Sequence, residues 1–261
     1  MDQTTIHETA EELLRAERSR TPVAPLAPRL VGMTVDDAYA IQSRVIEAKR
    51  REGDEIVGHK IGLTSGVMQQ MMGVDSPDFG HLLGSMMLSA EEPVPLGAFI
   101  QPRIEVEFAY ILGADLPQEG CTAADVDAAT EWVVPCLELI DSRIVDWRIG
   151  LLDTVADNAS SAAVVLGTER IRPSDIDLTD LAARLDINGE TVATGSTADV
   201  LGTPAGAVAW LANAVGQYGV RLKAGHVVLS GSCTRAIDVV PGDVAAAVFT
   251  GREPLTARFT D

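Results

Sequence analysis

Apolar residues recur at helical spacing twice within the first fifty residues. The segment from Thr4 to Arg18 and the segment that follows Thr34 each carry a stripe with a three-to-four-residue period. The stripes are Ile6, Ala10, Leu13 and Leu14, and then Ala38, Ile41, Val45 and Ala48. Thr34 precedes two aspartates, as is typical of a helix N-cap, and Gly53 predicts the stop. Prolines at 22, 25 and 28 separate two predicted helices.

From Ile56 onward the pattern favours strands, because apolar and polar residues alternate in short runs rich in Val and Ile. The predicted strands are 56–62, 101–111, 137–140, 226–230, 237–240 and 244–249, with a hairpin at 185–192 around Asn188-Gly189. Helices are predicted at 66–72, with Met68, Met71 and Met72 inward, after Thr122 with Val126, Trp132 and Val133, and at 204–218. We therefore expect an α+β protein, with a mainly helical N-terminal region at 1–75 and a β-rich domain at 76–261.

Composition narrows the range of partners. The chain has 261 residues, and its 38 acidic and 20 basic residues give a net charge of −18, which argues against nucleic acid and anionic membrane as partners. It has no apolar run long enough for a membrane span, and its first residues lack the basic and apolar regions of a signal peptide. Cys121, Cys136 and Cys233 lack C-x-x-C spacing and read as reduced thiols. We expect a cytoplasmic protein.

Two glutamates one residue apart carry most of the chemical information. Glu105 and Glu107 lie in a predicted strand, where residues i and i+2 share a face, so both carboxylates point the same way. Adjacent carboxylates repel unless a cation or a shared proton lies between them, and oxygen ligands suit Mg²⁺ or Mn²⁺. A solvated strand face is the alternative. Glu138, in the apolar run 137–140, adds a third carboxylate in a strand that has little reason to carry a surface charge.

Other candidates are less specific. Lys60 lies between Gly58 and Gly62, which permit close backbone approach, so it is a candidate for carboxylate binding or proton transfer, with a surface lysine as the alternative. Asp78 is a candidate acid or base within a sequence that also makes an ordinary turn. Arg235 lies in a loop of small residues and is a candidate anion contact. Cys233 has no feature of a nucleophile, and we interpret His59 and His81 as structural.

Five ordered motifs resemble the hydratase/decarboxylase family of meta-cleavage pathways, within the fumarylacetoacetate hydrolase-like superfamily. The motifs are GHKIGLTS at 58–65, MGVDSPDFG at 72–80, QPRIEVE at 101–107, LELIDSR at 137–143 and DTVADNAS at 153–160. The family contains 2-hydroxypenta-2,4-dienoate (2-keto-4-pentenoate) hydratases and 4-oxalocrotonate decarboxylases. G-x-S-x-G, G-x-G-x-x-G and Walker motifs, which mark other enzyme classes, do not occur in the chain.

The resemblance implies a β-rich rolled-sheet body and a ring-based homo-oligomer, to which the N-terminal amphipathic helices would contribute an apolar face. It implies a divalent metal, Mg²⁺ or Mn²⁺, on Glu105, Glu107 and Glu138. It makes Lys60 and Asp78 proton-handling or substrate-binding residues, and Ser160 a substrate contact. The implied activity is hydration of a 2-hydroxy-2,4-dienoate to a 4-hydroxy-2-oxoalkanoate, a product that a downstream aldolase would consume.

The sequence leaves alternatives open. A decarboxylase of 2-oxo-3-hexenedioate would use the same metal but would need a group for the second carboxylate, for which Arg235 is the candidate. An acylpyruvate-type hydrolase and a catalytically silent assembly partner are two further alternatives, although silence fits poorly with the intact Lys60, Asp78 and three glutamates. The loop SGSCTRAID at 230–238 resembles hydratases of steroid-ring degradation and so predicts a preference for an alkyl-extended dienoate.

Overall fold

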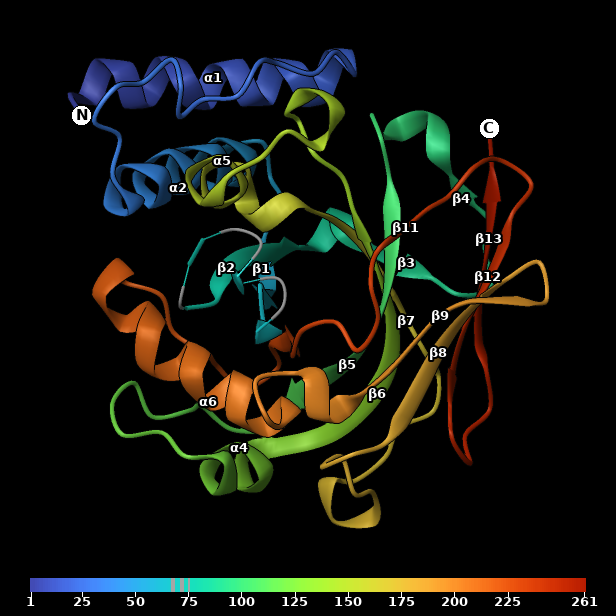
Figure 1. Cartoon of the computed structure of the whole chain (residues 1–261). Helices are drawn as coiled ribbons and strands as arrows, with labels where there is room; N and C mark the ends of the chain where they lie inside the picture. The colour runs from blue at the N-terminus through green and yellow to red at the C-terminus, as the bar shows by residue number, and fades with distance from the viewer. Residues whose placement is uncertain (67–68, 71–72, 75) are drawn as a thin grey trace.

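Two long helices stack on one another at the N-terminal end of the molecule (Figure 1). The computed structural model describes residues 1–66, 69–70, 73–74 and 76–261. Helix α1 spans Gln3–Ser19 and α2 spans Val35–Arg51, and Thr34 caps α2 in a reciprocal pairing with Asp37. The predicted apolar stripe of α1 is buried. Because α1 and α2 pack together, α2 covers this stripe within the same chain.

Within the described residues the strands form an eight-stranded and a five-stranded sheet. The larger sheet has the order β2-β1-β10-β5-β6-β7-β3, with β11 also pairing with β5, and the smaller has the order β4-β13-β12-β8-β9. The strands of the larger sheet are β1 (Ile56–Gly62), β2 (Asp78–Leu83), β3 (Met87–Ser89), β5 (Arg103–Leu112), β6 (Thr130–Ile140), β7 (Ser161–Leu166), β10 (Val227–Leu229) and β11 (Ile237–Asp238). Those of the smaller sheet are β4 (Val94–Pro95), β8 (Ala182–Ile187), β9 (Glu190–Ser196), β12 (Val244–Phe249) and β13 (Leu255–Thr260).

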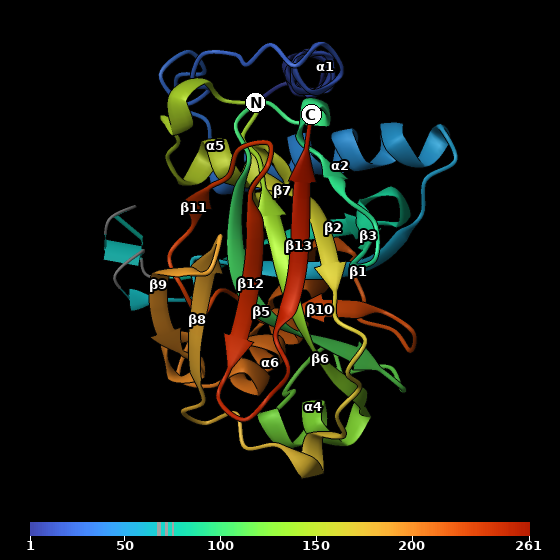
Figure 2. The same ribbon diagram turned by 90° about the vertical axis from the view of Figure 1, so that its right-hand side faces the viewer.

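The smaller sheet lies across β5 and β6 of the larger one (Figure 2). Phe108 of β5 meets Phe249 of β12 with ring centroids 4.2 Å apart, and both side chains are buried between the sheets. Helices α4 (Ala123–Ala129) and α6 (Pro204–Ala214) pack together at the far end of the large sheet from α1 and α2 (Figure 1). Helix α5 (Leu151–Ala156) packs on α2. The α+β prediction, with a helical N-terminal region and a curled β-rich body, is confirmed.

One predicted helix is partly wrong. Thr122 caps α4 as expected, but the helix ends at Ala129, and Trp132 and Val133 belong to β6. The run that follows Ala129 is rich in β-branched and aromatic residues and pairs with β5 along its whole length, so sheet pairing overrides the helical reading. The hairpin at Asn188-Gly189 is confirmed, with φ of 54° and 84° as a tight two-residue turn requires. The prediction that Met68, Met71 and Met72 point inward concerns residues outside the described part of the chain.

Strand β1 lies in the N-terminal segment 1–75 but pairs with β2 and β10 of the larger sheet. The parallel pairing with β10 brings the middle of β1 close to the central strands of the body. The division of the chain at residues 75 and 76 stays a prediction. Because the four strands β1, β2, β5 and β6 belong to one sheet, side chains from all of them can meet at one functional site.

Candidate metal centre

Three glutamates converge on one face of the paired strands β5 and β6. Glu105 lies directly opposite Glu138 in the antiparallel register, and Glu107 follows on the same face of β5. One carboxylate oxygen from each of the three lies within 4.8 Å of the others. Like charges placed opposite one another destabilise a sheet, so this arrangement requires a compensating cation or protons.

The buried oxygens of Glu138 lack hydrogen bonds from the described residues, and Lys60 is the cation that pairs with them. Glu138 is fully buried, and neither of its carboxylate oxygens accepts a hydrogen bond from a described residue. Glu107 is 1% exposed and accepts one hydrogen bond, from the backbone N–H of Gly231 at 2.9 Å. A buried carboxylate without partners is costly, whereas an oxygen-rich cluster of this kind suits a hard divalent cation. The residues therefore fit a metal site.

Lys60 supplies the nearest positive charge. Its Nζ forms an ion pair with Glu138 Oε2 at 3.3 Å, without the geometry of a hydrogen bond. The same Nζ donates a hydrogen bond to the carbonyl of Ala159 at 3.1 Å. Burial alone would lower the pKa of the ammonium, but the surrounding carboxylates, first that of Glu138, outweigh burial and raise it. Lys60 is therefore a fixed cation at the edge of the carboxylate cluster.

Asp78 reaches the same site from β2, where it pairs with Gly62 of β1. Its Oδ1 has no hydrogen-bond partner among the described residues, and burial raises the pKa of its carboxyl to about 6 although Lys60 opposes the shift. A Cβ on Gly62 would lie 2.1 Å from Asp78 Oδ1, so only glycine leaves room for this carboxyl. The sequence predicts close approach at Gly62, and the structure shows that the approaching group is the Asp78 carboxyl.

The carboxyls of the cluster hold their protons to a higher pH than free carboxyls do. Burial raises the pKa of Glu105 to about 7, and burial together with the carboxylate of Glu138 raises the pKa of Glu107 well above its ordinary value. The pKa of Glu138 shifts in the same direction, also because of burial, although Lys60 opposes the shift. A metal ion must displace these protons before it can bind, so metal affinity is linked to pH.

A left-handed turn carries the group that holds Lys60. Asn158, Ala159 and Ser160 have φ of 54°, 51° and 55°, a region that residues with a Cβ rarely adopt. The side chain of Asn158 accepts from the backbone N–H of His81 at 2.8 Å and donates to its carbonyl at 2.9 Å, which fixes the turn against β2. The Ser160 hydroxyl is buried 3.3 Å from the hydroxyl of Thr154. Ser160 thus lies next to the carbonyl that contacts Lys60.

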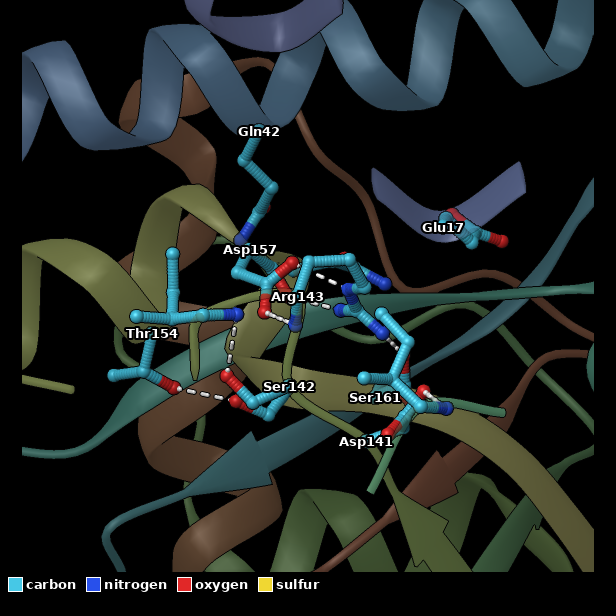
Figure 3. Close-up of polar contacts among 12 residues, drawn as sticks. Glu17, Gln42, Asp141, Ser142, Arg143, Thr154, Asp157 and Ser161 are labelled. Carbon is cyan, nitrogen blue, oxygen red and sulfur yellow. Dashed lines mark hydrogen bonds and ion pairs between the residues drawn. The ribbon is translucent and has the colours of Figure 1, made fainter. Parts of the chain in front are cut away.

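A buried ion pair between Arg143 and Asp157 supports this turn (Figure 3). The backbone N–H and the guanidinium of Arg143 donate to both oxygens of the Asp157 carboxylate, at 2.9 and 2.5 Å. The guanidinium also donates to the carbonyl of Asp157 at 2.6 Å. Gln42 reaches down from α2 and donates to the carbonyls of Phe79 and Val155, linking the helical layer to β2 and α5. These residues position the site through contacts between segments far apart in the sequence.

Arg235 is not brought into the cluster. Its side chain is exposed, and its guanidinium donates to the carbonyl of Val192 on β9 at 2.8 Å. The loop 230–238 reaches the carboxylates through Gly231, whose backbone N–H bonds to Glu107. Cys233 in the same loop is buried, and burial raises the pKa of its thiol, which fits the expectation that it is not a nucleophile.

Comparison with known proteins places this geometry in a family. Residues 63–260 match the model of the fumarylacetoacetate hydrolase C-terminal family, and the chain belongs to this family. The chain is 46% identical over 237 residues to a 2-keto-4-pentenoate hydratase of Paraburkholderia xenovorans, covering 91% of this chain and 88% of that protein. It is 42% identical to a 2-hydroxyhexa-2,4-dienoate hydratase of Comamonas testosteroni, over 100% of this chain and 99% of that protein.

The fold agrees with the sequence match. The structure superposes with a TM-score of 0.96 on a 4-oxalocrotonate decarboxylase from Pseudomonas putida G7 complexed with magnesium and adipate, with 34% identity over 99% of this chain and 98% of that chain. The predicted family resemblance is therefore confirmed. Within the described part of the chain, the helices are too short or too polar to cross a membrane.

Proposed function

We propose that this protein is a metal-dependent hydro-lyase that adds water to a 2-hydroxy-2,4-dienoate and forms a 4-hydroxy-2-oxoalkanoate in aromatic-ring catabolism. The observation that carries the proposal is the set of three converging glutamates beside Lys60 and Asp78, in which the buried oxygens of Glu138 accept no hydrogen bond from a described residue. The names of relatives that are 42–46% identical over at least 91% of this chain support hydration as the reaction.

Glu105, Glu107 and Glu138 would hold the metal, and we propose Mg²⁺ or Mn²⁺. Related structures are complexed with magnesium, with calcium or with Mn²⁺, although the Mn²⁺ complex is only 15% identical and shares the fold alone. When bound, such an ion acts as a Lewis acid that stabilises negative charge developing on the 2-oxygen of the substrate. The carboxylate and 2-oxygen of a dienoate would be the substrate groups that an ion held by the three glutamates polarises.

The protein's own groups would move the protons. Asp78 has a pKa of about 6, so it can both accept and release a proton near neutral pH. Lys60 has a raised pKa and stays protonated, which suits it to binding the anionic substrate and holding its oxygen rather than to acting as a base. Ser160, adjacent to the carbonyl that fixes Lys60, would donate to the substrate. The reaction then needs protonation at the far end of the dienolate and addition of water at C4.

Decarboxylation of 2-oxo-3-hexenedioate is the second candidate, favoured by the superposition on the decarboxylase. It needs a cation or a donor for the second carboxylate. Arg235, the candidate from sequence, is exposed and donates to a backbone carbonyl, so it gives decarboxylation little support. We also propose a preference for an alkyl-extended dienoate, on the loop at 230–238.

Product analysis by NMR tests both reactions. The purified protein with Mg²⁺ is offered 2-hydroxypentadienoate, 2-hydroxyhexadienoate and 2-oxo-3-hexenedioate in separate reactions, and carbon dioxide is followed in parallel. We expect 4-hydroxy-2-oxoalkanoates from both dienoates and no stoichiometric carbon dioxide. Carbon dioxide from the diacid without hydration of either dienoate would overturn the assignment. A faster reaction with the five-carbon dienoate would overturn only the chain-length preference.

A further inference from the structure

A cavity of about 370 Å³ opens on the other side of the strands that carry Lys60 and Asp78. Because side chains alternate along a strand, His59 and His81 point away from the carboxylate site and into this cavity. His226, one residue before β10, completes a group of three histidines from neighbouring strands. The chain has only four histidines, so three of them line one cavity.

Three ring nitrogens of two of these histidines have no hydrogen-bond partner among the described residues. His59 is 1% exposed and His81 is 5% exposed. Both nitrogens of His59 and Nδ1 of His81 lack a hydrogen-bond partner among the described residues. The ring of His59 lies 5.1 Å from that of His81 and 5.4 Å from that of His226, measured between centroids. Buried imidazole nitrogens without hydrogen-bond partners are unusual, and they indicate that a ligand supplies the missing partners.

The charge around the cavity is opposite to the charge of the chain. Arg50, Arg221 and Lys223 line it, against a single acidic residue, Glu55. In a chain with 38 acidic and 20 basic residues, a random lining would be mainly acidic. Within the described residues none of these three cations forms a salt bridge. The cavity therefore offers free positive charge next to imidazole donors.

The lining favours an anion over a metal ion. Burial lowers the pKa of His59 and lowers that of His81 to about 4, so both rings are neutral near pH 7 and each keeps one N–H donor. Three nearby cations would repel a metal ion. The described residues with three ligand atoms close enough for one metal are the glutamates of the other site, not these histidines.

We propose that this cavity is a binding site for a small multivalent anion, a phosphoryl or dicarboxylate group, held by Arg50, Arg221 and Lys223 and by the imidazoles of His59 and His81. Hydrogen bonds from these groups to an anion are charge-assisted, and such bonds are stronger than hydrogen bonds between neutral groups. The site is separate from the carboxylate cluster, because it lies on the opposite face of β1 and β2. It does not rest on the hydratase proposal.

Histidine resonances give a direct test, with an internal control. The protein is labelled with ¹³C at histidine, and inorganic phosphate or malonate is titrated at constant ionic strength. We expect saturable shifts of the His59, His81 and His226 signals with a Kd of roughly 1 mM or tighter, while His7, exposed on α1, does not move. Response to phosphate alone indicates a phosphoryl ligand, and response to malonate alone indicates a dicarboxylate. No saturable shift with either anion would overturn the proposal.

Substitution of two exposed cations distinguishes binding at this site from general charge effects. The double variant Arg221→Ala with Lys223→Ala should bind the anion at least tenfold more weakly, since each change removes a charge-assisted contact. Arg258→Ala, an exposed arginine on β13 of the other sheet, is the matched control and should bind as the parent does. Equal affinity of the double variant and the control would overturn the proposal even if the histidine signals move.

Discussion

Lys60 Nζ lies 3.3 Å from Glu138 Oε2, and both side chains are at least 95% buried. Removing one partner of a buried ion pair leaves the other uncompensated, which costs about 3 kcal/mol. Lys60→Met should therefore destabilise the metal-free protein by about this amount. Because a bound cation would replace the lost charge, Mg²⁺ should stabilise this variant more than it stabilises the parent. Thermal unfolding with chelator and with Mg²⁺ measures both effects.

The control for this experiment is Lys49→Met. Lys49 pairs with Glu17 at 2.6 Å, but both side chains are partly exposed, so the loss should stay within about 1 kcal/mol. Its response to Mg²⁺ should equal that of the parent. If Mg²⁺ stabilised the two lysine variants equally, Lys60 would not belong to a metal centre.

Glu107→Gln tests the metal ligands directly. The change removes one negative charge and little volume, and the amide can still accept from Gly231. We expect metal affinity, measured by calorimetry, and hydratase activity to fall together, while circular dichroism shows an intact fold. Glu131→Gln, an exposed glutamate on β6, is the matched control and should change neither. Full activity of Glu107→Gln in the presence of a chelator would refute the site.

The metal-free protein should lose stability as the pH rises. Burial raises the pKa of Glu105 from 4.5 to about 7 and that of Asp78 from 3.8 to about 6 in the folded state. A carboxyl whose folded pKa is raised favours the protonated native state, so stability is highest below the unfolded pKa and falls as the pH rises to about 7. Denaturant unfolding with chelator between pH 4 and 8 measures this loss; a curve that rises throughout would contradict it.

Excess Mg²⁺ should reverse the trend over the same range. Protons and the metal compete for the same oxygens, so a higher pH strengthens metal binding and adds stability through mass action. The two unfolding curves should therefore diverge as the pH rises from about 5 to 8. Parallel curves would show that the metal does not bind to these carboxyls.

Gly62→Ala should reduce activity more than stability. Its Cβ would lie 2.1 Å from Asp78 Oδ1 and 3.6 Å from Lys60 Nζ, so the Asp78 carboxyl must move while the backbone need not. We expect turnover to fall at least tenfold, and the pH profile to change because Asp78 is displaced. Gly97→Ala, whose nearest neighbour lies at 3.6 Å, is the control and should retain full activity.

The proposed homo-oligomer now rests on the family resemblance alone. The apolar stripe of α1, which was expected to meet a neighbouring subunit, packs on α2 of the same chain. Light scattering at micromolar concentration should still give a multiple of 27.6 kDa. A clean monomer would refute the oligomer and would leave the metal site untouched.

The spacing of residues along the chain predicted those features that depend on the periodicity of helices, strands and turns. The shared face of Glu105 and Glu107, the cap at Thr34 and the Asn188-Gly189 hairpin all depend on residues a few positions apart, and all are observed. The alignment of Glu138 with Glu105 depends on the register between two strands, which spacing does not encode. The resemblance supplied this link instead.

Long-range contacts account for what the sequence missed. Asn158 binds His81 across 77 residues, and nothing near either residue predicts that contact. The fit of Gly62 against Asp78 likewise exists only because β1 pairs with β2. The helical stripe after Thr122 predicts a helical Trp132, whereas pairing with β5 places this residue in a strand.

The left-handed turn at 158–160 has a consequence for the entropy of substrate binding. A free lysine side chain loses about 2 kcal/mol of rotamer freedom when it is ordered. The carbonyl of Ala159, fixed by the turn, and the carboxylate of Glu138 already order the Lys60 side chain in the folded protein. That loss therefore occurs during folding, so a substrate that meets Lys60 finds its ammonium already in place.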